Sequence, residues 1–142
     1  MGHNMATKAE ESGHGKRVLI VEDNVDSADT MQLLLQISGY DARTAYDGAS
    51  ALEIAREFEP HVILLDIGLP LRDGFEVARD LRALPQTRSA FLVALTGYGQ
   101  EEDRQRASNA GFDAFQVKPV EPGALETLIR AYFHAREDVA GR

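Results

Sequence analysis

The sequence has no cysteine, an excess of acidic over basic residues and no long apolar run. The lack of cysteine excludes disulfides, thiolate zinc sites and thiol nucleophiles. With 15 lysines and arginines against 23 acidic residues, the net charge of -8 disfavours binding to nucleic acid or to an anionic membrane surface. No segment approaches the roughly 20 apolar residues of a membrane helix, and no apolar signal-peptide core follows the N-terminus. We therefore expect a soluble, cytoplasmic protein that contacts neither nucleic acid nor membrane directly.

The remaining composition is typical of one globular domain. The chain has 142 residues, of which 44% are hydrophobic and 27% are charged, so it can bury a core without disulfides. Residues 1–16 are mostly polar and predict a flexible tail, a linker or a tag, and 137–142 predict a second flexible tail. The domain itself is predicted to span 17–136. His3 and His14 lie in the first tail, where a metal site is disfavoured.

Five short apolar segments alternate with five amphipathic segments. The former predict strands, and the latter, with apolar residues at i, i+3, i+4 and i+7, predict helices. Asp26 is a candidate cap of the first helix, Asp47 turns the chain into the second, and Asp73 opens the third. This alternation predicts an α/β fold with a doubly wound parallel sheet. The predicted strands are Arg17–Val21, a weaker edge strand Asp41–Ala45, Val62–Asp66, Phe91–Leu95 and Phe112–Val117.

The segment from Gln100 to Ala110 differs from the other predicted helices. Charged residues dominate it, so that only small apolar side chains such as Ala107 and Ala110 remain to be buried. A helix that gains so little from packing should be loosely docked. We expect Arg104 and Arg106 to lie on a solvated face, which we assign to the surface that meets a partner.

The chain is organised around the run from Val62 to Pro70. Four aliphatic residues indicate a strand buried on both faces, which ends at Asp66 before Gly68 and Pro70 break it into a loop. A carboxylate at the carboxyl end of a buried parallel strand lies where open α/β sheets place their ligands. The simpler interpretation is that Asp66 only caps the loop that follows.

Other predicted strands also end on chemically active side chains. Glu22 and Asp23 follow the first strand, Thr96 ends the fourth and Lys118 ends the fifth. Since the carboxyl ends of parallel strands share one edge of a sheet, these groups should converge with Asp66. The acids would share Mg²⁺, a hard cation that binds carboxylates, water and phosphate oxygens. With a lysine and a hydroxyl beside them, the pattern predicts transfer of a phosphoryl group onto Asp66.

Four short motifs at the ends of the predicted strands strengthen this interpretation. They are Val-Glu-Asp-Asn at 21–24, Leu-Leu-Asp-Ile-Gly-Leu-Pro at 64–70 with Asp73-Gly74, Leu-Thr-Gly at 95–97 and Val-Lys-Pro at 117–119. In this order they resemble the receiver domain of bacterial two-component response regulators, the CheY-like family. The resemblance covers about residues 16–136. It implies a flavodoxin-like sheet of five parallel strands in the order 2-1-3-4-5, with five helices.

The resemblance also implies roles for the residues of the site. Asp66 corresponds to the phosphoacceptor, and Lys118 to the lysine that contacts the phosphoryl group. The carboxylates of Asp23 and Asp66 and the backbone carbonyl of Gly68 correspond to the Mg²⁺ ligands. Glu22 stands where the family has an acid that holds the metal through water.

Thr96 and Phe115 correspond to the two switch positions of the family. One is the hydroxyl that turns toward the phosphoryl group, and the other is the aromatic residue whose rotamer reports activation. The family often has tyrosine at the position of Phe115, so a role for its hydroxyl is lost here. From the residues alone, Phe115 is equally well a core residue of its strand. The resemblance also implies a cis peptide bond between Lys118 and Pro119.

As partners, the resemblance implies a histidine kinase or a histidine phosphotransfer protein, and then a downstream protein whose binding changes. The domain would catalyse its own phosphorylation and dephosphorylation without turning over a free metabolite. We expect either a stand-alone regulator or the receiver of a larger protein such as a hybrid histidine kinase. The linker-like N-terminus favours the second.

Three other classes of protein fit these residues less well. An aspartyl-phosphate, Mg²⁺-dependent phosphatase usually has a second acid two residues after the nucleophile, where this chain has Gly68. A flavin-type electron carrier needs a phosphate loop after the first strand, where acids stand here. A non-phosphorylated interaction module is disfavoured because the acid, aspartate, threonine and lysine positions are all filled. Elsewhere, we expect Tyr98 in a surface loop and His61 solvated at the entry of a strand.

Overall fold

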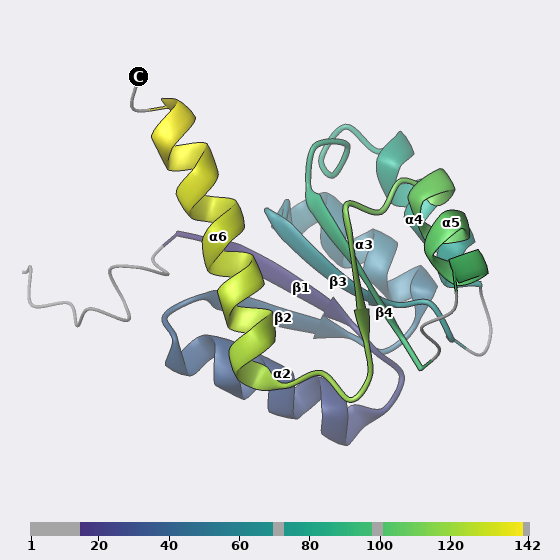
Figure 1. Ribbon diagram of the computed structural model, residues 1–142, viewed down its shortest axis with the longest axis horizontal. Coiled ribbons are helices and arrows are strands. Elements are labelled where there is room, and N and C mark those ends of the chain that lie inside the picture. Colours follow the sequence, from purple (N-terminus) through teal and green to yellow (C-terminus); the bar gives the residue numbers. More distant parts are fainter. Residues whose placement is uncertain (1–14, 70–72, 98–100, 141–142) are drawn as a thin grey trace, which may run out of the picture.

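The computed structural model describes residues 15–69, 73–97 and 101–140. Within these residues, five strands alternate with five helices (Figure 1). The predicted tail histidines, Pro70 and Tyr98 lie outside the described residues. In chain order the elements are β1 (Arg17–Val21), α2 (Val25–Ile37), β2 (Asp41–Ala45), α3 (Gly48–Phe58), β3 (Val62–Asp66), α4 (Gly74–Ala83), β4 (Phe91–Thr96), α5 (Glu101–Ala110), β5 (Ala114–Val117) and α6 (Pro122–Ala140).

The strands form one parallel sheet in the order β2-β1-β3-β4-β5, as predicted. The polar strand β2 lies at an edge, and the fully buried strand β3 lies in the centre. In the register, Val21 lies beside Leu65, and Asp66 lies beside Leu95. The carboxyl ends of β1, β3, β4 and β5 therefore meet at one edge of the sheet.

Helices cover both faces of this sheet (Figure 1). On one face, α3, α4 and α5 enclose a core that includes Leu19 and Ile63, and on the other, α2 and α6 enclose a core that includes Ile20 and Leu64. Neighbouring residues of a strand point to opposite faces. A central strand between two helical layers therefore buries every side chain, which explains the unbroken aliphatic run of β3.

The predicted start is confirmed for two of the first three helices. The side chains of Asp47 and Asp73 cap α3 and α4 by accepting backbone hydrogen bonds. The prediction for α2 is wrong, because Asn24 is its cap rather than Asp26. The Asn24 side chain accepts a hydrogen bond from Ser27 N–H at 2.9 Å, and Asp26 lies within the first helical turn. Both residue types cap well, and the backbone at Asn24 is still extended, so the helix begins directly after it.

Helix α6 is longer than predicted. It continues to Ala140, beyond the end of the domain that the sequence predicted at 136. No glycine or proline interrupts the helix between Gly123 and Gly141, and Glu137 lies 3.1 Å from the Lys16 amine. Lys16 is thereby tied to the domain just ahead of β1. Even α6 lacks the apolar character needed to cross a bilayer, as do all the other described helices.

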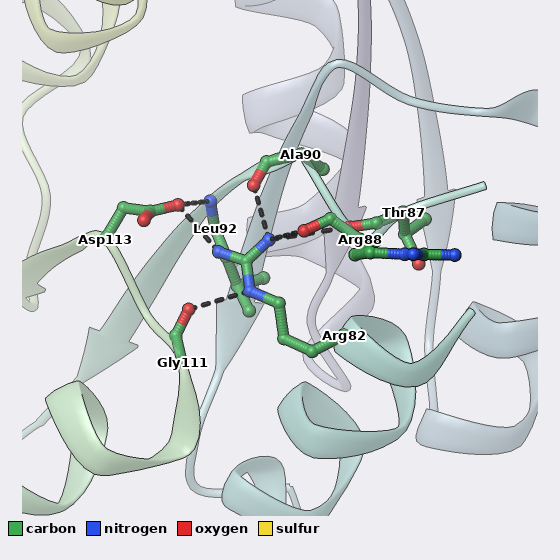
Figure 2. A network of polar contacts seen from close by, with 7 residues as sticks. All are labelled: Arg82, Thr87, Arg88, Ala90, Leu92, Gly111 and Asp113. Atoms are coloured by element: carbon green, nitrogen blue, oxygen red, sulfur yellow. Dashed lines mark hydrogen bonds and ion pairs between the residues drawn. The ribbon is translucent and has the colours of Figure 1, made fainter. Parts of the chain in front are cut away.

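Arg82 joins three segments at the amino-terminal edge of the sheet (Figure 2). Its guanidinium donates hydrogen bonds to the carbonyl oxygens of Ala90 at 2.7 Å and Gly111 at 2.9 Å, and to Asp113 Oδ2 at 2.7 Å. The same Asp113 oxygen accepts from Leu92 N–H at 2.9 Å. This network fixes the end of α4 to the starts of β4 and β5. Nothing in the local sequence distinguishes Arg82 from an ordinary surface arginine.

Candidate functional site

Asp66 ends β3 at the carboxyl edge of the sheet and is 6% exposed. Its Oδ1 accepts a hydrogen bond from Gly68 N–H at 2.8 Å. This contact is the loop cap that the simpler interpretation predicted. The cap uses only Oδ1. The other carboxylate oxygen, Oδ2, accepts a hydrogen bond from the amine of Lys118.

Lys118 connects two buried acids that are distant in the sequence. Its Nζ lies 2.8 Å from Asp66 Oδ2 and 2.6 Å from Glu22 Oε1. Burial alone lowers the pKa of the amine, but the hydrogen bonds and the charges of Asp66 and Glu22 outweigh it, so the pKa lies above its ordinary value. Lys118 therefore places a fixed positive charge beside the Asp66 carboxylate at neutral pH.

Glu22 follows β1 and is 1% exposed. Its Oε1 accepts from Lys118, and its Oε2 accepts from Asn24 N–H at 3.0 Å. Burial raises the pKa of Glu22 most strongly, and repulsion from Asp66 adds to this, while the two hydrogen bonds lower it in part. The net result is a pKa above the ordinary value. The protonation of Glu22 therefore depends on the charges of both Asp66 and Lys118.

Asp23 completes a cluster of three acids. Carboxylate oxygens of Glu22, Asp23 and Asp66 lie within 4.8 Å of one another. Asp23 is exposed whereas the other two are buried, so the cluster opens to solvent on the Asp23 side. Carboxylates at such separations repel one another unless a cation or a proton offsets their charge. The structure thus brings together the acids and the lysine that the sequence placed at the ends of three strands.

Gly74 allows α4 to begin directly against the backbone of Asp66. A Cβ atom at Gly74 would overlap Ile67 Cα and would lie 2.9 Å from the Asp66 carbonyl oxygen. The neighbouring Asp73 caps the same helix, with Oδ1 accepting from Phe75 N–H at 2.9 Å. The Asp73-Gly74 motif therefore fixes α4 behind the phosphate-binding edge that the sequence predicted.

Thr96 lies at the end of β4, beside the strand that carries Asp66. It is 2% exposed, and its carbonyl oxygen accepts from Lys118 N–H at 2.6 Å. This bond extends the pairing of β4 and β5 by one residue and fixes the start of the Lys118 side chain. The Lys118–Pro119 bond is cis, as the resemblance implied.

Phe115 lies on β5 opposite Ala94, which is two residues before Thr96 on β4. Residues two apart on a strand share a face, so Phe115 and Thr96 point to the same side of the sheet. Phe115 is half-buried and packs against the core of that face. Its interpretation as a core residue is therefore correct in part. The exposed side of the ring is covered by Arg104, whose guanidinium carbon lies 4.7 Å from the ring centroid.

His61, at the other end of β3, is not the solvated residue that we predicted. Its Nδ1 accepts from Arg17 N–H at 3.0 Å, and its ring meets Phe133 edge-on with centroids 5.7 Å apart. Burial, with smaller effects of Arg17 and Arg136, lowers the pKa of His61. The sequence carried no signal for this role, because the partners come from β1 and α6.

The fold and the site geometry agree with a comparison against known families. Residues 18–130 match the family described as the response regulator receiver domain. The chain belongs to this receiver family. Receiver domains act in two-component and phosphorelay signalling, and they are signalling modules rather than classical enzymes.

Individual relatives support this placement of the receiver domain. The polar-differentiation response regulator DivK of Brucella anthropi is 35% identical over 114 residues, which are 80% of this chain and 93% of DivK. A CheY-like receiver domain protein from Methanospirillum hungatei JF-1 has a TM-score of 0.80 at 29% identity, with 87% of this chain and 97% of that chain covered.

A third relative has a magnesium ion coordinated in its active site cleft. It is the receiver domain of sensor histidine kinase PA1611 from Pseudomonas aeruginosa PAO1. Its TM-score is 0.75 at 29% identity, with 82% of this chain and 96% of that chain covered. The CheY-like fold predicted for this chain is confirmed by these structures.

A groove of about 680 Å³ opens beside the site of this receiver domain, between α2 and α6. Glu22 and Lys118 line one end, and mostly apolar residues of the two helices line the rest. Next to it, α2 exposes three large aliphatic side chains, Val25, Leu33 and Ile37. Exposed large apolar side chains next to an apolar groove favour an interaction surface.

Proposed function

We propose that Asp66 accepts a phosphoryl group from a phosphohistidine of a histidine kinase or histidine phosphotransfer protein. The phosphorylated domain would then bind a downstream protein with altered affinity. The observation that carries this proposal is the pairing of Asp66 Oδ2 with Lys118 Nζ at 2.8 Å, within a cluster of acids suited to a cation. A carboxylate can receive a negatively charged group only where positive charge offsets the repulsion.

The chemistry requires little from the protein beyond position and charge. An Asp66 oxygen attacks phosphorus, an O–P bond forms, the P–N bond to the donor histidine breaks, and the released imidazole takes a proton from water. Asp66 attacks as a carboxylate, so no general base is needed. Lys118 stays protonated because Asp66 and Glu22 raise its pKa, and it offsets charge on the transferred oxygens.

The acid cluster fits Mg²⁺, a cation that prefers oxygen ligands. Asp23 and Asp66 would bind it directly, together with the carbonyl of Gly68 in the following loop. Glu22 suits contact through water, since Lys118 and Asn24 N–H already engage both of its oxygens. When bound, Mg²⁺ supplies positive charge that stabilises the transferred phosphoryl group.

The groove between α2 and α6 supports a docking site for the phosphodonor. It ends at Glu22 and Lys118, and its apolar lining suits the apolar face of a helix. A donor helix in this groove would present its phosphohistidine to Asp66. We place this transfer in the cytoplasm, where ATP supplies the phosphoryl group of the donor.

The output of the domain would be a change in conformation around Asp66. The Thr96 hydroxyl would turn to the phosphoryl group, and Phe115 would move on the same face of the sheet. Such a change biases the affinity for a partner because the partner distinguishes two populated states.

Intact-mass spectrometry after incubation with acetyl phosphate tests the acceptor. We expect one phosphoryl adduct on the wild-type protein with Mg²⁺, none with EDTA, and none on Asp66→Asn. Asp73→Asn is the matched control, because asparagine can still cap α4 and the adduct should persist. An adduct on Asp66→Asn would contradict the proposal. So would the absence of both an adduct and beryllofluoride binding in the wild-type protein.

A further inference from the structure

Helix α5 docks on the sheet with little apolar surface. Of its ten residues, Ala107 and Ala110 are buried, each about 3% exposed, among the side chains that the structure describes. Two methyl groups bury little area compared with the leucine and phenylalanine side chains of α4 and α6. Other contacts must therefore hold α5 in position.

Two arginines of α5 provide such contacts by covering aromatic rings. Arg106 lies 4.2 Å from the ring centroid of Phe75 and 3.7 Å from Asp73 Oδ2, both at the start of α4. Arg104 lies 4.7 Å from the ring centroid of Phe115 on β5. A guanidinium over a ring face is attracted by the ring quadrupole. Arg106 thus connects α5 to α4, and Arg104 connects α5 to the sheet.

The two rings differ in their freedom to move. Phe75 is 4% exposed and belongs to the core between α4 and the sheet. Phe115 is half-buried on the edge strand β5, and it faces the small side chain of Ala94 beside Thr96. A ring at the margin of the core, with a small neighbour, is held less firmly by packing. The Arg104 contact therefore contributes a larger share of what keeps Phe115 in place.

We propose that Arg104 is a positioning residue for Phe115. Its guanidinium holds the ring in the unphosphorylated position, and movement of the ring toward Thr96 breaks this contact. The inference rests on the proposed function, because it assumes that Phe115 moves when Asp66 carries a phosphoryl group. The contact favours the unphosphorylated state, so by linkage it weakens the binding of a phosphoryl mimic at Asp66 by the same factor.

Beryllofluoride binding in the presence of Mg²⁺, followed by fluorine NMR on the full chain, tests this role. We expect Arg104→Gln to bind beryllofluoride about two- to fivefold more tightly than the wild-type protein, as a contact of this type predicts. Removal of a positive charge by itself weakens the binding of an anion. Tighter binding therefore cannot be a simple charge effect. Ring resonances of Phe115 should also shift toward their beryllofluoride-bound positions in the free variant.

Two variants serve as controls for this measurement. Gln105→Ala alters the adjacent exposed position and should bind beryllofluoride like the wild-type protein. In a Phe115→Leu background, Arg104→Gln should no longer tighten beryllofluoride binding, because the ring that Arg104 covers is absent and only the loss of charge remains. Arg104→Lys keeps the charge but loses the planar group, and we expect an intermediate affinity.

The outcomes separate this inference from the proposed function. Unchanged or weaker binding by Arg104→Gln, with normal binding by the wild-type protein, would overturn the role of Arg104 and leave Asp66 as the acceptor. An equal tightening by Arg104→Gln in the Phe115→Leu background would also overturn it. Failure of the wild-type protein itself to bind beryllofluoride would instead contradict the proposed function.

Discussion

His61 depends on its neutral form for the contact that it makes. Its Nδ1 can accept from Arg17 N–H only while that nitrogen carries no proton. Burial, Arg17 and Arg136 lower the pKa of the ring below its ordinary value of 6.5. Below this pH the unfolded chain binds a proton that the folded protein does not bind. The stabilisation is therefore present above about pH 6.5 and is lost as the pH falls.

We expect the free energy of unfolding of the wild-type protein to fall relative to that of His61→Asn between pH 6.5 and about pH 5. Asparagine keeps an acceptor oxygen near the place of Nδ1 but does not titrate. Urea denaturation at several pH values in EDTA measures the difference, since the other acids titrate alike in both proteins. Parallel pH curves for the two proteins would contradict this role of His61.

Helix α4 is held at each end by contacts outside its apolar face. At its start, the missing side chain of Gly74 lets the helix meet the backbone of Asp66 and Ile67. At its end, Arg82 donates hydrogen bonds to the carbonyl oxygens of Ala90 and Gly111. Carbonyl groups that are taken from water need such donors, because an unpaired group loses its hydration without replacement.

Arg82→Met should lower the free energy of unfolding by about 2 kcal/mol or more, because several carbonyl groups and Asp113 lose a donor at once. Arg79→Met is the matched control on the exposed side of the same helix and should change stability by less than about 0.5 kcal/mol. Chemical denaturation measures both variants.

The proposed phosphorylation site should tolerate the loss of Arg82. The Arg82 network lies at the edge of the sheet opposite Asp66, so the folded variant should still form the acetyl phosphate adduct at low temperature. Equal stability of Arg82→Met and Arg79→Met would show that the network adds nothing to folding.

At the scale of the whole molecule, the repulsion within the acid cluster should lower the stability of the folded chain, and a cation that binds there should restore it. The chain has a net charge of -8, and Glu22, Asp23 and Asp66 place three of its acids within 4.8 Å of one another. Lys118 offsets only part of this charge. A ligand that binds the folded chain alone stabilises it by RT ln(1 + [L]/Kd), about 2.7 kcal/mol at 100 times Kd.

We therefore expect added Mg²⁺ to raise the thermal midpoint of the wild-type protein and EDTA to reverse the rise. Asp23→Asn should lose most of this response, because it removes the exposed carboxylate of the cluster. Asp26→Asn is the control, since it removes an exposed acid of the nearby helix α2 and should leave the response intact. An equal rise in Asp23→Asn and the wild-type protein would contradict the assigned metal site.

Periodicity in the sequence was sufficient to predict each strand and helix, within a few residues at the ends. The strand-end positions of Glu22, Asp66, Thr96 and Lys118 also followed, because any parallel sheet brings its strand ends to one edge. The order of the strands came from the family resemblance, since alternation of strands and helices is compatible with several orders. The choice of Asn24 over Asp26 as a cap could not be predicted, because both side chains are equally suited to it.

Contacts between distant residues were decided only by the tertiary structure. Lys118 meets Asp66 and Glu22 across 52 and 96 positions of the chain. The contacts of His61, Arg82 and Arg104 were likewise visible only in the tertiary structure. In the sequence these three residues looked like ordinary polar residues. A local sequence pattern predicts which residues are buried, because burial follows the period of a helix or strand. It does not state which charge meets which ring or carbonyl, because that depends on how the packed layers bring separate segments together.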